Sequence, residues 1–352
     1  MIHKYCLNGY RIVLDTNSGA VHVFDELPYA MLEYLDEEVP ETPPKDMWEK
    51  LSKTYDPQAI QEAYAELRQL FEEGSLFSSD EDYTKLSNLL QNAPIKAMCL
   101  NVAHDCNLKC EYCFASKGDF GCGPKLMSFE VGKKAIDFLI ENSGSRRNLE
   151  VDFFGGEPLM NFPVVKQIVS YARKVEKEKN KNFRFTLTTN GVLLTDDIIE
   201  YLNQEMSNVV LSLDGRKEVN DRLRVKKNGA GCYEDIVPKY QKLVATRGDK
   251  DYYIRGTFTT HNLDFAEDAL HIAELGFDQL SIEPVVSDPS LEYSLKEENL
   301  PTAFAEYERL ANVTLERRKQ KKGFNFFHFM IDLNQGPCAI KRLRGCGCGN
   351  EY

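Results

Sequence analysis

From Ile95 onward, apolar residues follow two alternating patterns along the chain. Short β-prone runs are each followed by a longer segment in which apolar residues recur at helical spacing, and this order is found six times. The predicted strands cover residues 96–102, 149–154, 183–188, 208–213, 252–259 and 279–284. The predicted helices cover residues 128–141, 163–179, 195–203, 233–245, 263–275 and 301–319. Six consecutive strand–helix units predict an α/β domain over residues 95–320, with a parallel sheet and right-handed crossovers that curls towards a barrel.

The first 80 residues follow a different pattern. Two β-prone runs, 10–15 and 21–25, are joined by residues with turn chemistry, which predicts a hairpin. Helical patterns follow at 28–35, 45–55 and 57–73, and the last of them ends at Gly74. We therefore expect a small α+β domain over residues 1–80 and a linker over residues 81–94.

Composition and charge restrict the partners of the chain. Its 352 residues are 42% hydrophobic, which is enough for a substantial core. The formal net charge of -12 repels phosphate backbones and anionic membrane surfaces, so we expect no nucleic-acid or membrane partner. No segment has the apolar run of a signal peptide or a membrane span, which predicts a cytoplasmic location.

The ten Cys residues are unevenly distributed. Disulfide bonds rarely persist in a reducing cytosol, so we do not expect these Cys to form a disulfide framework. Clusters of Cys instead indicate metal binding or catalysis. One cluster lies in residues 106–113 and another in residues 338–348. The scattered residues Cys6, Cys99, Cys122 and Cys232 are expected to pack as small buried hydrophobes.

The first cluster, Cys106, Cys110 and Cys113, follows the first predicted strand of the α/β domain. Three thiolates at this C-x-x-x-C-x-x-C spacing can bind three irons of a four-iron cluster and leave the fourth iron open for another ligand. A zinc site is the alternative, but it normally has four ligands, and His104 is the only other candidate nearby. The spacing therefore favours an iron–sulfur cluster.

Short polar motifs follow the next three predicted strands. They are the segments 155–158 (GGEP), 188–191 (TTNG) and 212–215 (SLDG), with Arg224 in the loop after the last of them. Each motif alone is typical of an ordinary turn. Because the carboxyl ends of parallel strands meet at one edge of a sheet, however, we expect these motifs to surround one site together with the three Cys.

Together these residues resemble the radical S-adenosylmethionine (radical SAM) superfamily over about residues 95–284. The resemblance implies a partial (β/α)6 TIM-like barrel that holds a 4Fe-4S cluster and S-adenosylmethionine and cleaves the latter reductively to a deoxyadenosyl radical. It also implies that Cys106, Cys110 and Cys113 bind the cluster. Contacts to S-adenosylmethionine are implied for Phe114 beside the adenine, for Gly155, Gly156 and Glu157 at the methionyl amine, and for Thr188, Asn190, Ser212 and Arg224 at the ribose or carboxylate.

The last 32 residues, 321–352, contain the second Cys cluster, Cys338, Cys346 and Cys348. They resemble the beginning of a SPASM-type domain, which implies that these Cys bind one or more auxiliary 4Fe-4S clusters. That family pattern continues with further Cys, so we expect the full-length protein to extend beyond Tyr352. The alternative is a tail with incidental Cys, since such tracts are weak metal signals.

The N-terminal domain resembles the winged-helix-like, PqqD-like element of peptide-modifying enzymes. This implies recognition of a leader peptide as an added strand. Winged helices also bind DNA, but residues 1–78 contain six Lys and Arg against fifteen Asp and Glu, a balance of 6 − 15 = −9. This acidic balance favours a peptide over DNA.

The whole arrangement resembles the thioether-forming maturases of SCIFF peptides, which belong to the sactipeptide and ranthipeptide class. The resemblance implies a Cys-rich precursor peptide as substrate, a bond between a Cys sulfur and a carbon of an acceptor residue such as Thr, and an electron donor such as flavodoxin or ferredoxin. The alternatives are an anaerobic sulfatase maturase or a carbon–carbon cross-linking enzyme. The alternative from a different functional class is a protein that is not an enzyme, either a leader-binding scaffold or a DNA-binding regulator with a redox-sensing cluster.

Overall fold

The computed structural model describes residues 1–79 and 94–333, which fold into two compact units. The first unit lies in residues 1–79 and the second begins at Pro94. Most of the expected linker and the three C-terminal Cys, Cys338, Cys346 and Cys348, lie outside the described residues. Within the described residues, no helix is both long and apolar enough to cross a membrane.

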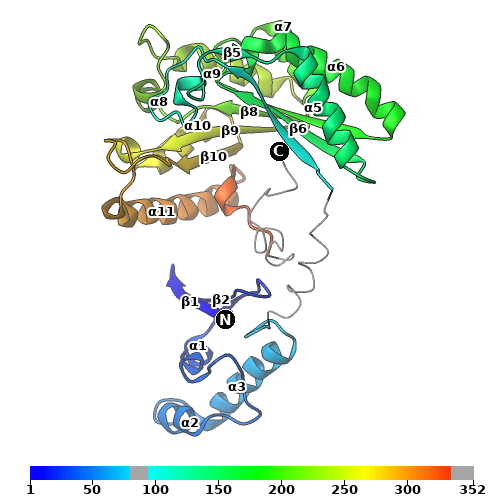
Figure 1. Cartoon of the computed structure of the whole chain (residues 1–352). Coiled ribbons are helices and arrows are strands. Elements are labelled where there is room, and N and C mark those ends of the chain that lie inside the picture. Colours follow the sequence, from blue (N-terminus) through cyan, green and yellow to red (C-terminus); the bar gives the residue numbers. More distant parts are fainter. Residues whose placement is uncertain (80–93, 334–352) are drawn as a thin grey trace. The chain divides into compact units, whose positions relative to one another are not determined.

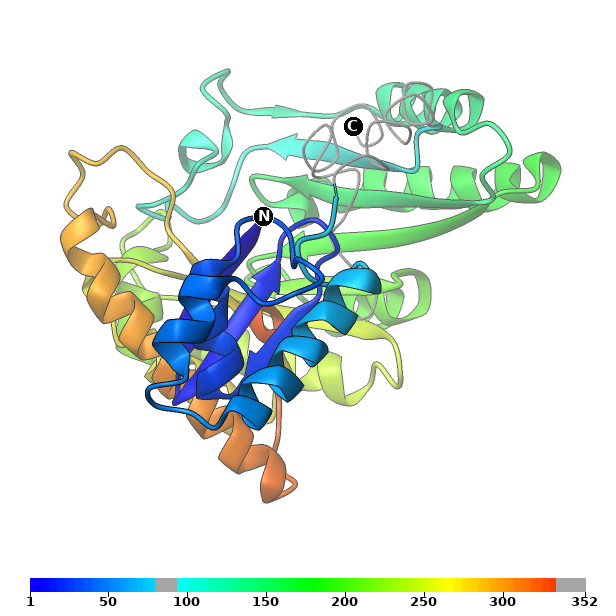
Figure 2. The same ribbon diagram turned by 90° about the horizontal axis from the view of Figure 1, so that it is seen from below.

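The N-terminal unit is a three-stranded antiparallel sheet with helices packed along it (Figure 2). Its strands are β1 (Ile2–Leu7), β2 (Tyr10–Asp15) and β3 (Val21–Phe24), and its helices are α1 (Glu26–Met31), η1 (Leu32–Tyr34), α2 (Lys45–Leu51) and α3 (Pro57–Glu72). The predicted hairpin and the three helical segments are confirmed. Strand β1 was not predicted, because most of its residues are exposed and its sequence therefore lacks a clear apolar alternation.

The second unit contains an eight-stranded sheet in the order β11-β10-β9-β8-β7-β6-β4-β5. All neighbouring strands are parallel except β5, which pairs antiparallel with β4. The strands are β4 (Ala97–His104), β5 (Lys125–Leu126), β6 (Asn148–Gly155), β7 (Asn182–Thr189), β8 (Asn208–Ser212), β9 (Asp251–Phe258), β10 (Gln279–Pro284) and β11 (Asn325–Phe326). The six predicted strands and their parallel order are confirmed.

Helices connect these strands, and α5, α6 and α7 lie along one face of the sheet (Figure 1). They are α5 (Phe129–Asn142), α6 (Phe162–Lys179), α7 (Asp196–Glu205), α8 (Lys217–Leu223), α9 (Tyr233–Ala245), α10 (Phe265–Glu274) and α11 (Leu300–Lys319). Short 3-10 turns are η2 (Ser116–Gly118), η3 (Pro158–Asn161), η4 (Thr260–Asn262), η5 (Glu297–Asn299) and η6 (Phe327–Phe329). The predicted helices are confirmed, whereas α8 and the two-residue strands β5 and β11 are too short to give a periodic signal.

Alternation along the strands separates an apolar face from a polar face. On β6 the side chains of Leu149, Val151 and Phe153 are buried, while Glu150 and Asp152 point to the opposite side. The other central strands repeat this pattern, so the apolar face packs in one core with the helices. The polar face is therefore left to line the inside of the curved sheet.

The expectation that all four scattered Cys are buried is wrong for three of them. Cys232 is buried, but Cys6, Cys99 and Cys122 are exposed. Cys6 lies on the edge strand β1 and Cys122 on the loop before β5, and neither position belongs to a buried face. Cys99 lies on β4 between two buried residues and so faces the opposite, polar side of the sheet.

Candidate functional site

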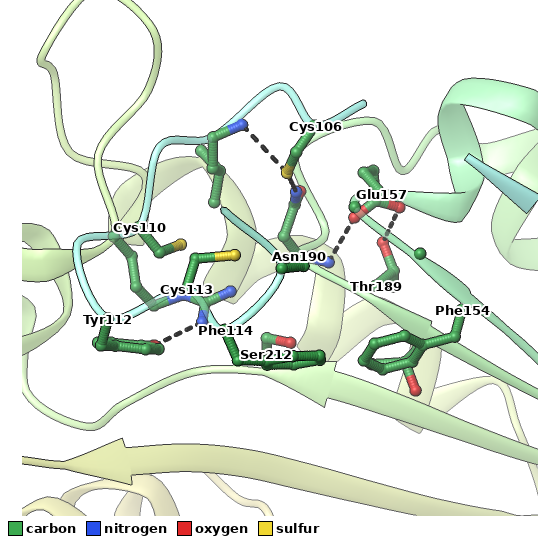
Figure 3. Close-up of a pocket in the computed structure, with 16 residues that line it drawn as sticks. Cys106, Cys110, Tyr112, Cys113, Phe114, Phe154, Glu157, Thr189, Asn190 and Ser212 are labelled. Carbon is green, nitrogen blue, oxygen red and sulfur yellow. Dashed lines mark hydrogen bonds between the residues drawn. The ribbon is translucent and has the colours of Figure 1, made fainter. Parts of the chain in front are cut away.

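The loops after β4, β6, β7 and β8 surround a cavity of about 130 Å³ at the carboxyl ends of the strands. All eleven site residues predicted within the described part of the chain line this one cavity: Cys106, Cys110, Cys113, Phe114, Gly155, Gly156, Glu157, Thr188, Asn190, Ser212 and Arg224. Figure 3 shows ten of the residues that line it with their labels. The chain order of the motifs therefore predicted correctly which residues meet in space.

The three-Cys loop is held against the end of α8 and the residues that follow it. The amide of Lys109 donates to the carbonyl of Val225 at 2.8 Å, and the amide of Glu111 donates to the carbonyl of Leu223 at 2.9 Å. Cys106 is fixed separately, because its Sγ accepts hydrogen bonds from the Leu108 amide at 3.4 Å and the Asn190 Nδ2 at 3.6 Å. These contacts orient the three thiols into the cavity (Figure 3).

The donor set of this loop fits an iron–sulfur cluster. All three thiols are free, and among the described residues no three His, Cys, Asp or Glu side chains are arranged around a single metal ion. A four-iron cluster instead places each of its three Cys ligands on a different iron. His104, the extra ligand that a zinc site would need, packs against the ring of Phe120 with 4.8 Å between ring centroids.

Burial raises the pKa of Cys106 to about 11 and that of Cys110 to about 12. Both thiols therefore keep their protons at neutral pH while no metal is bound. Iron binds the thiolate, so loading the site must release these protons.

Gly155 and Gly156 are needed for close contact between backbone segments. A β-carbon on Gly155 would lie 2.3 Å from the carbonyl oxygen of Ala103, and one on Gly156 would lie 2.2 Å from the carbonyl oxygen of Asp105. Gly155 also has a φ of +138°, a conformation that other residues rarely adopt. The two glycines therefore allow the beginning of the three-Cys loop to pack directly on the end of β6.

Glu157 is almost completely buried, and its carboxylate joins the ends of β6 and β7. Its oxygens accept hydrogen bonds from the Thr189 hydroxyl at 2.8 Å and the Asn190 amide at 2.8 Å (Figure 3). A third hydrogen bond comes from the Leu159 amide at 3.0 Å. Burial raises the pKa of Glu157 to about 7, although these three donors oppose the shift. The side chain thus holds the site together, and its predicted contact with an amine stays a prediction.

A second buried polar cluster contains Tyr112, Asp214 and Arg224, of which only Arg224 was predicted. The Tyr112 hydroxyl donates to Asp214 Oδ2 at 2.6 Å and accepts from Arg224 Nη1 at 2.8 Å. Within the described residues, Arg224 Nε is buried and has no hydrogen-bond partner. The available signals for Tyr112 and Asp214 were an aromatic residue between two Cys and an acidic residue directly after a strand.

The rings of Phe114 and Phe154 lie side by side, with 6.1 Å between centroids and 24° between planes. Phe114 is 76% exposed, so its outer face is open to a ligand. A second cavity of about 320 Å³ shares Thr188, Ser212 and Arg224 with the first and continues along the polar face of the sheet. It reaches Glu283, whose carboxylate is hydrogen-bonded to His328 at 2.9 Å.

A protein-family model described as the radical SAM superfamily matches residues 100–247. Residues 100–247 are a radical SAM domain. This match contains the three-Cys loop and every other predicted site residue that the structure describes. Radical SAM enzymes use a 4Fe-4S cluster with S-adenosylmethionine, so the expected cofactor class is confirmed for the domain.

Individual relatives of the radical SAM domain include maturation enzymes. The chain is 24% identical over 222 residues to the radical SAM cyclopropyl synthase TigE of Paramaledivibacter caminithermalis, a match that covers 56% of this chain and 44% of TigE. It is 27% identical over 137 residues to the cysteine-type anaerobic sulfatase-maturating enzyme of Clostridium novyi, with 38% and 36% covered. The chain therefore spans less than half of either relative.

The solved structure of anSMEcpe with bound AdoMet and the Kp18Cys peptide has a similar fold. The TM-score is 0.59 at 20% sequence identity, and the match covers 67% of this chain and 64% of that one. At this identity the likeness supports the fold of the radical SAM domain, and it confirms the predicted α/β fold class.

Proposed function

We propose that this chain cleaves S-adenosylmethionine reductively and uses the resulting radical to modify a peptide. The observation that carries the proposal is the convergence of the three free thiols and eight further predicted residues on one cavity. A 4Fe-4S cluster bound by these thiols would supply the single electron that breaks the sulfonium bond, giving methionine and the deoxyadenosyl radical.

The residues of the chain would bind and orient S-adenosylmethionine. Phe114 offers an exposed ring face that suits the adenine, and Thr188 and Ser212 offer hydroxyls at adjacent strand ends. The unpartnered Nε of Arg224 can donate to a carboxylate. Glu157 retains unused lone pairs on its carboxylate and can accept a hydrogen bond from an ammonium group.

Anaerobic reconstitution of the whole chain tests this proposal. With iron, sulfide, a strong reductant and S-adenosylmethionine, we expect deoxyadenosine and methionine to form. Replacing Cys106, Cys110 and Cys113 together by Ala should reduce deoxyadenosine to background, because no thiolate remains to bind the cluster. The matched control replaces the exposed Cys6 and Cys122 by Ala and should retain wild-type cleavage. Wild-type cleavage by the triple variant would refute the proposal.

The finer proposal is a peptide maturase that forms a thioether in a Cys-rich precursor. Its support is the relation to maturation enzymes, the solved relative with a bound peptide, and the second cavity beside the first. In this proposal the deoxyadenosyl radical would take a hydrogen atom from a carbon of the peptide and become deoxyadenosine. The carbon radical would then bond to a Cys sulfur of the same peptide, held on an auxiliary cluster, while the thiol releases its proton and the remaining electron passes to that cluster. A sulfatase maturase or a carbon–carbon cross-linking enzyme is the alternative, and mass spectrometry of the modified peptide distinguishes the three products.

The N-terminal unit would bind the leader of that precursor. Among the described residues, β1 and β3 form the two unpaired edges of its sheet, where a peptide can add as a fourth strand. The acidic balance of residues 1–78 opposes binding to DNA. The unit has its own core around Val13, Met31 and Ile60, so it can be expressed alone.

A binding experiment with the N-terminal unit tests this part of the proposal. We expect it to bind the labelled leader of a Cys-rich peptide encoded beside the gene, and not a labelled DNA duplex. In the whole chain, deletion of the unit should leave cofactor cleavage intact while peptide modification falls sharply. Salt-sensitive binding of the duplex without binding of the leader would count against a maturase.

A further inference from the structure

Residues 108–111 of the three-Cys loop pair with residues 223–226, and the register of this pairing places the positive charge of Arg224 beside the loop. The two backbone hydrogen bonds Lys109–Val225 and Glu111–Leu223 have the spacing of an antiparallel pair, and the bridge between Leu108 and Lys226 continues it. In this register Cys110 lies opposite Arg224, at a position without a backbone hydrogen bond between them. Side chains at such positions point to the same side and approach closely.

Arg224 is buried and held in one orientation. Only 7% of the residue is exposed, and Nη1 donates to the Tyr112 hydroxyl at 2.8 Å. Tyr112 is itself fixed by its hydrogen bond to Asp214, whose Oδ1 accepts from the Thr257 amide at 3.1 Å. An arginine remains protonated in proteins, so its positive charge is permanent at this place.

Asp214 is also charged when ionised and would partly cancel the field of Arg224. Its Oδ1 lies 3.8 Å from Arg224 Nη1, and the Tyr112 hydroxyl is hydrogen-bonded to both side chains. Arg224 lines the same cavity as the three thiols, whereas Asp214 is not among the residues that line it. The charge that faces the thiols from this cluster is therefore that of the arginine.

We propose that Arg224 makes a cluster on Cys106, Cys110 and Cys113 easier to reduce, and that Tyr112 and Asp214 are the positioning residues that hold it there. Reduction adds one electron and so one negative charge to the cluster. A buried cation nearby stabilises the reduced form more than the oxidised form, and burial limits screening by solvent. The inference rests on the proposed function, since it requires that these thiols hold the cluster.

The role differs from a contact with the carboxylate of S-adenosylmethionine because it exists before that ligand binds. The test is a redox titration of the reconstituted whole chain without S-adenosylmethionine, followed by electron paramagnetic resonance of the reduced cluster. Two variants, Arg224→Gln and Arg224→Lys, both lose the planar guanidinium, but only the first loses the charge.

We expect Arg224→Gln to make the equilibrium constant for reduction at least about tenfold smaller, a shift of about 59 mV to more negative potential for one electron. Arg224→Lys should stay within about threefold of the wild type. The matched control is Lys227→Met, which removes an exposed lysine paired with Asp105 near the same loop and should also stay within about threefold. Equal potentials for the wild type and Arg224→Gln would overturn the inference.

Tyr112→Phe gives a second measurement if the Arg224 variants do not assemble a cluster. Loss of the hydroxyl removes the group between Arg224 and Asp214, so the cation can move towards the carboxylate and away from the loop. We expect a smaller shift in the same negative direction, and an unchanged or more positive potential would overturn the inference.

If the wild type itself binds no 4Fe-4S cluster, the proposed function fails. If it holds the cluster and cleaves S-adenosylmethionine while the variants keep its potential, only this inference fails.

Discussion

Two buried arginines of the second unit have opposite surroundings. Arg247 follows α9 and precedes β9, so it lies at the amino ends of the strands. Its guanidinium donates to the carbonyls of Asp251, Leu202 and Met206 and to the side chain of Asn203. Arg224 lies at the carboxyl ends and keeps an unpartnered Nε.

The difference shows how the same residue type serves the fold at one end of the sheet and the site at the other. Arg247 meets neutral carbonyls, and burial lowers its pKa to about 10. Burial lowers the pKa of Arg224, but Tyr112, Cys110 and Asp214 outweigh this effect and raise the pKa well above its usual value. A buried donor without a partner normally costs stability, so its retention at Arg224 is consistent with a ligand at that place.

Arg247→Met should give the largest loss of stability. It leaves three backbone carbonyls without their donor, and we expect a loss of about 3 kcal/mol in the free energy of unfolding. Chemical denaturation followed by circular dichroism measures this loss. The control is Arg184→Ala at the same end of the sheet, whose ion pair with Asp251 is exposed and should contribute less than about 1 kcal/mol. Equal effects of the two substitutions would remove the contrast between the arginines.

Glu157 and Asp152 show the same contrast between a buried side chain with several hydrogen-bond partners and one with an unpartnered buried atom. Glu157→Gln places an amide where three donors point, so we expect it to lose about 2 kcal/mol of stability and to reduce iron content together with cofactor binding. Denaturation and iron analysis measure the two effects. The matched control, Glu150→Gln at an exposed position of β6, should change neither. Unchanged stability and iron with weaker binding of S-adenosylmethionine would instead identify Glu157 as a ligand contact alone.

Asp152 differs because its Oδ1 is buried and, among the described residues, has no hydrogen-bond partner. Burial raises its pKa to about 6, so the folded state binds a proton more tightly than the unfolded state. The contribution of protonated Asp152 to the stability of the folded state is therefore fully present below about pH 4 and is lost as the pH rises through 6.

Asp152→Asn removes this ionisation and should stabilise the protein by about 1 kcal/mol above pH 6, with little change near pH 4. Thermal unfolding across this pH range measures the effect. Asp249→Asn, an exposed substitution in the same unit, should change stability equally little at both ends of the range. A loss of stability in Asp152→Asn at pH 7 would show that the carboxylate has a partner in solution.

Local sequence patterns predicted most of the second unit because its strands and helices are long enough to show a period. The six central strands alternate apolar and polar residues, and each following helix repeats apolar positions at its own spacing. The same method missed β1, α8, β5 and β11, which are short or exposed. The expectation that Cys99 is buried was also wrong, because it rested on the usual burial of free Cys and not on the alternation of β4.

The sequence by itself determined the chemistry of the candidate site. The spacing of Cys106, Cys110 and Cys113 is local, and the rule that parallel strands end at one edge brings the remaining motifs to it. Only the tertiary structure decided what each side chain contacts there. The position of Arg224 opposite Cys110 and the three donors around Glu157 depend on how segments distant in the sequence pair and pack, which no local pattern specifies.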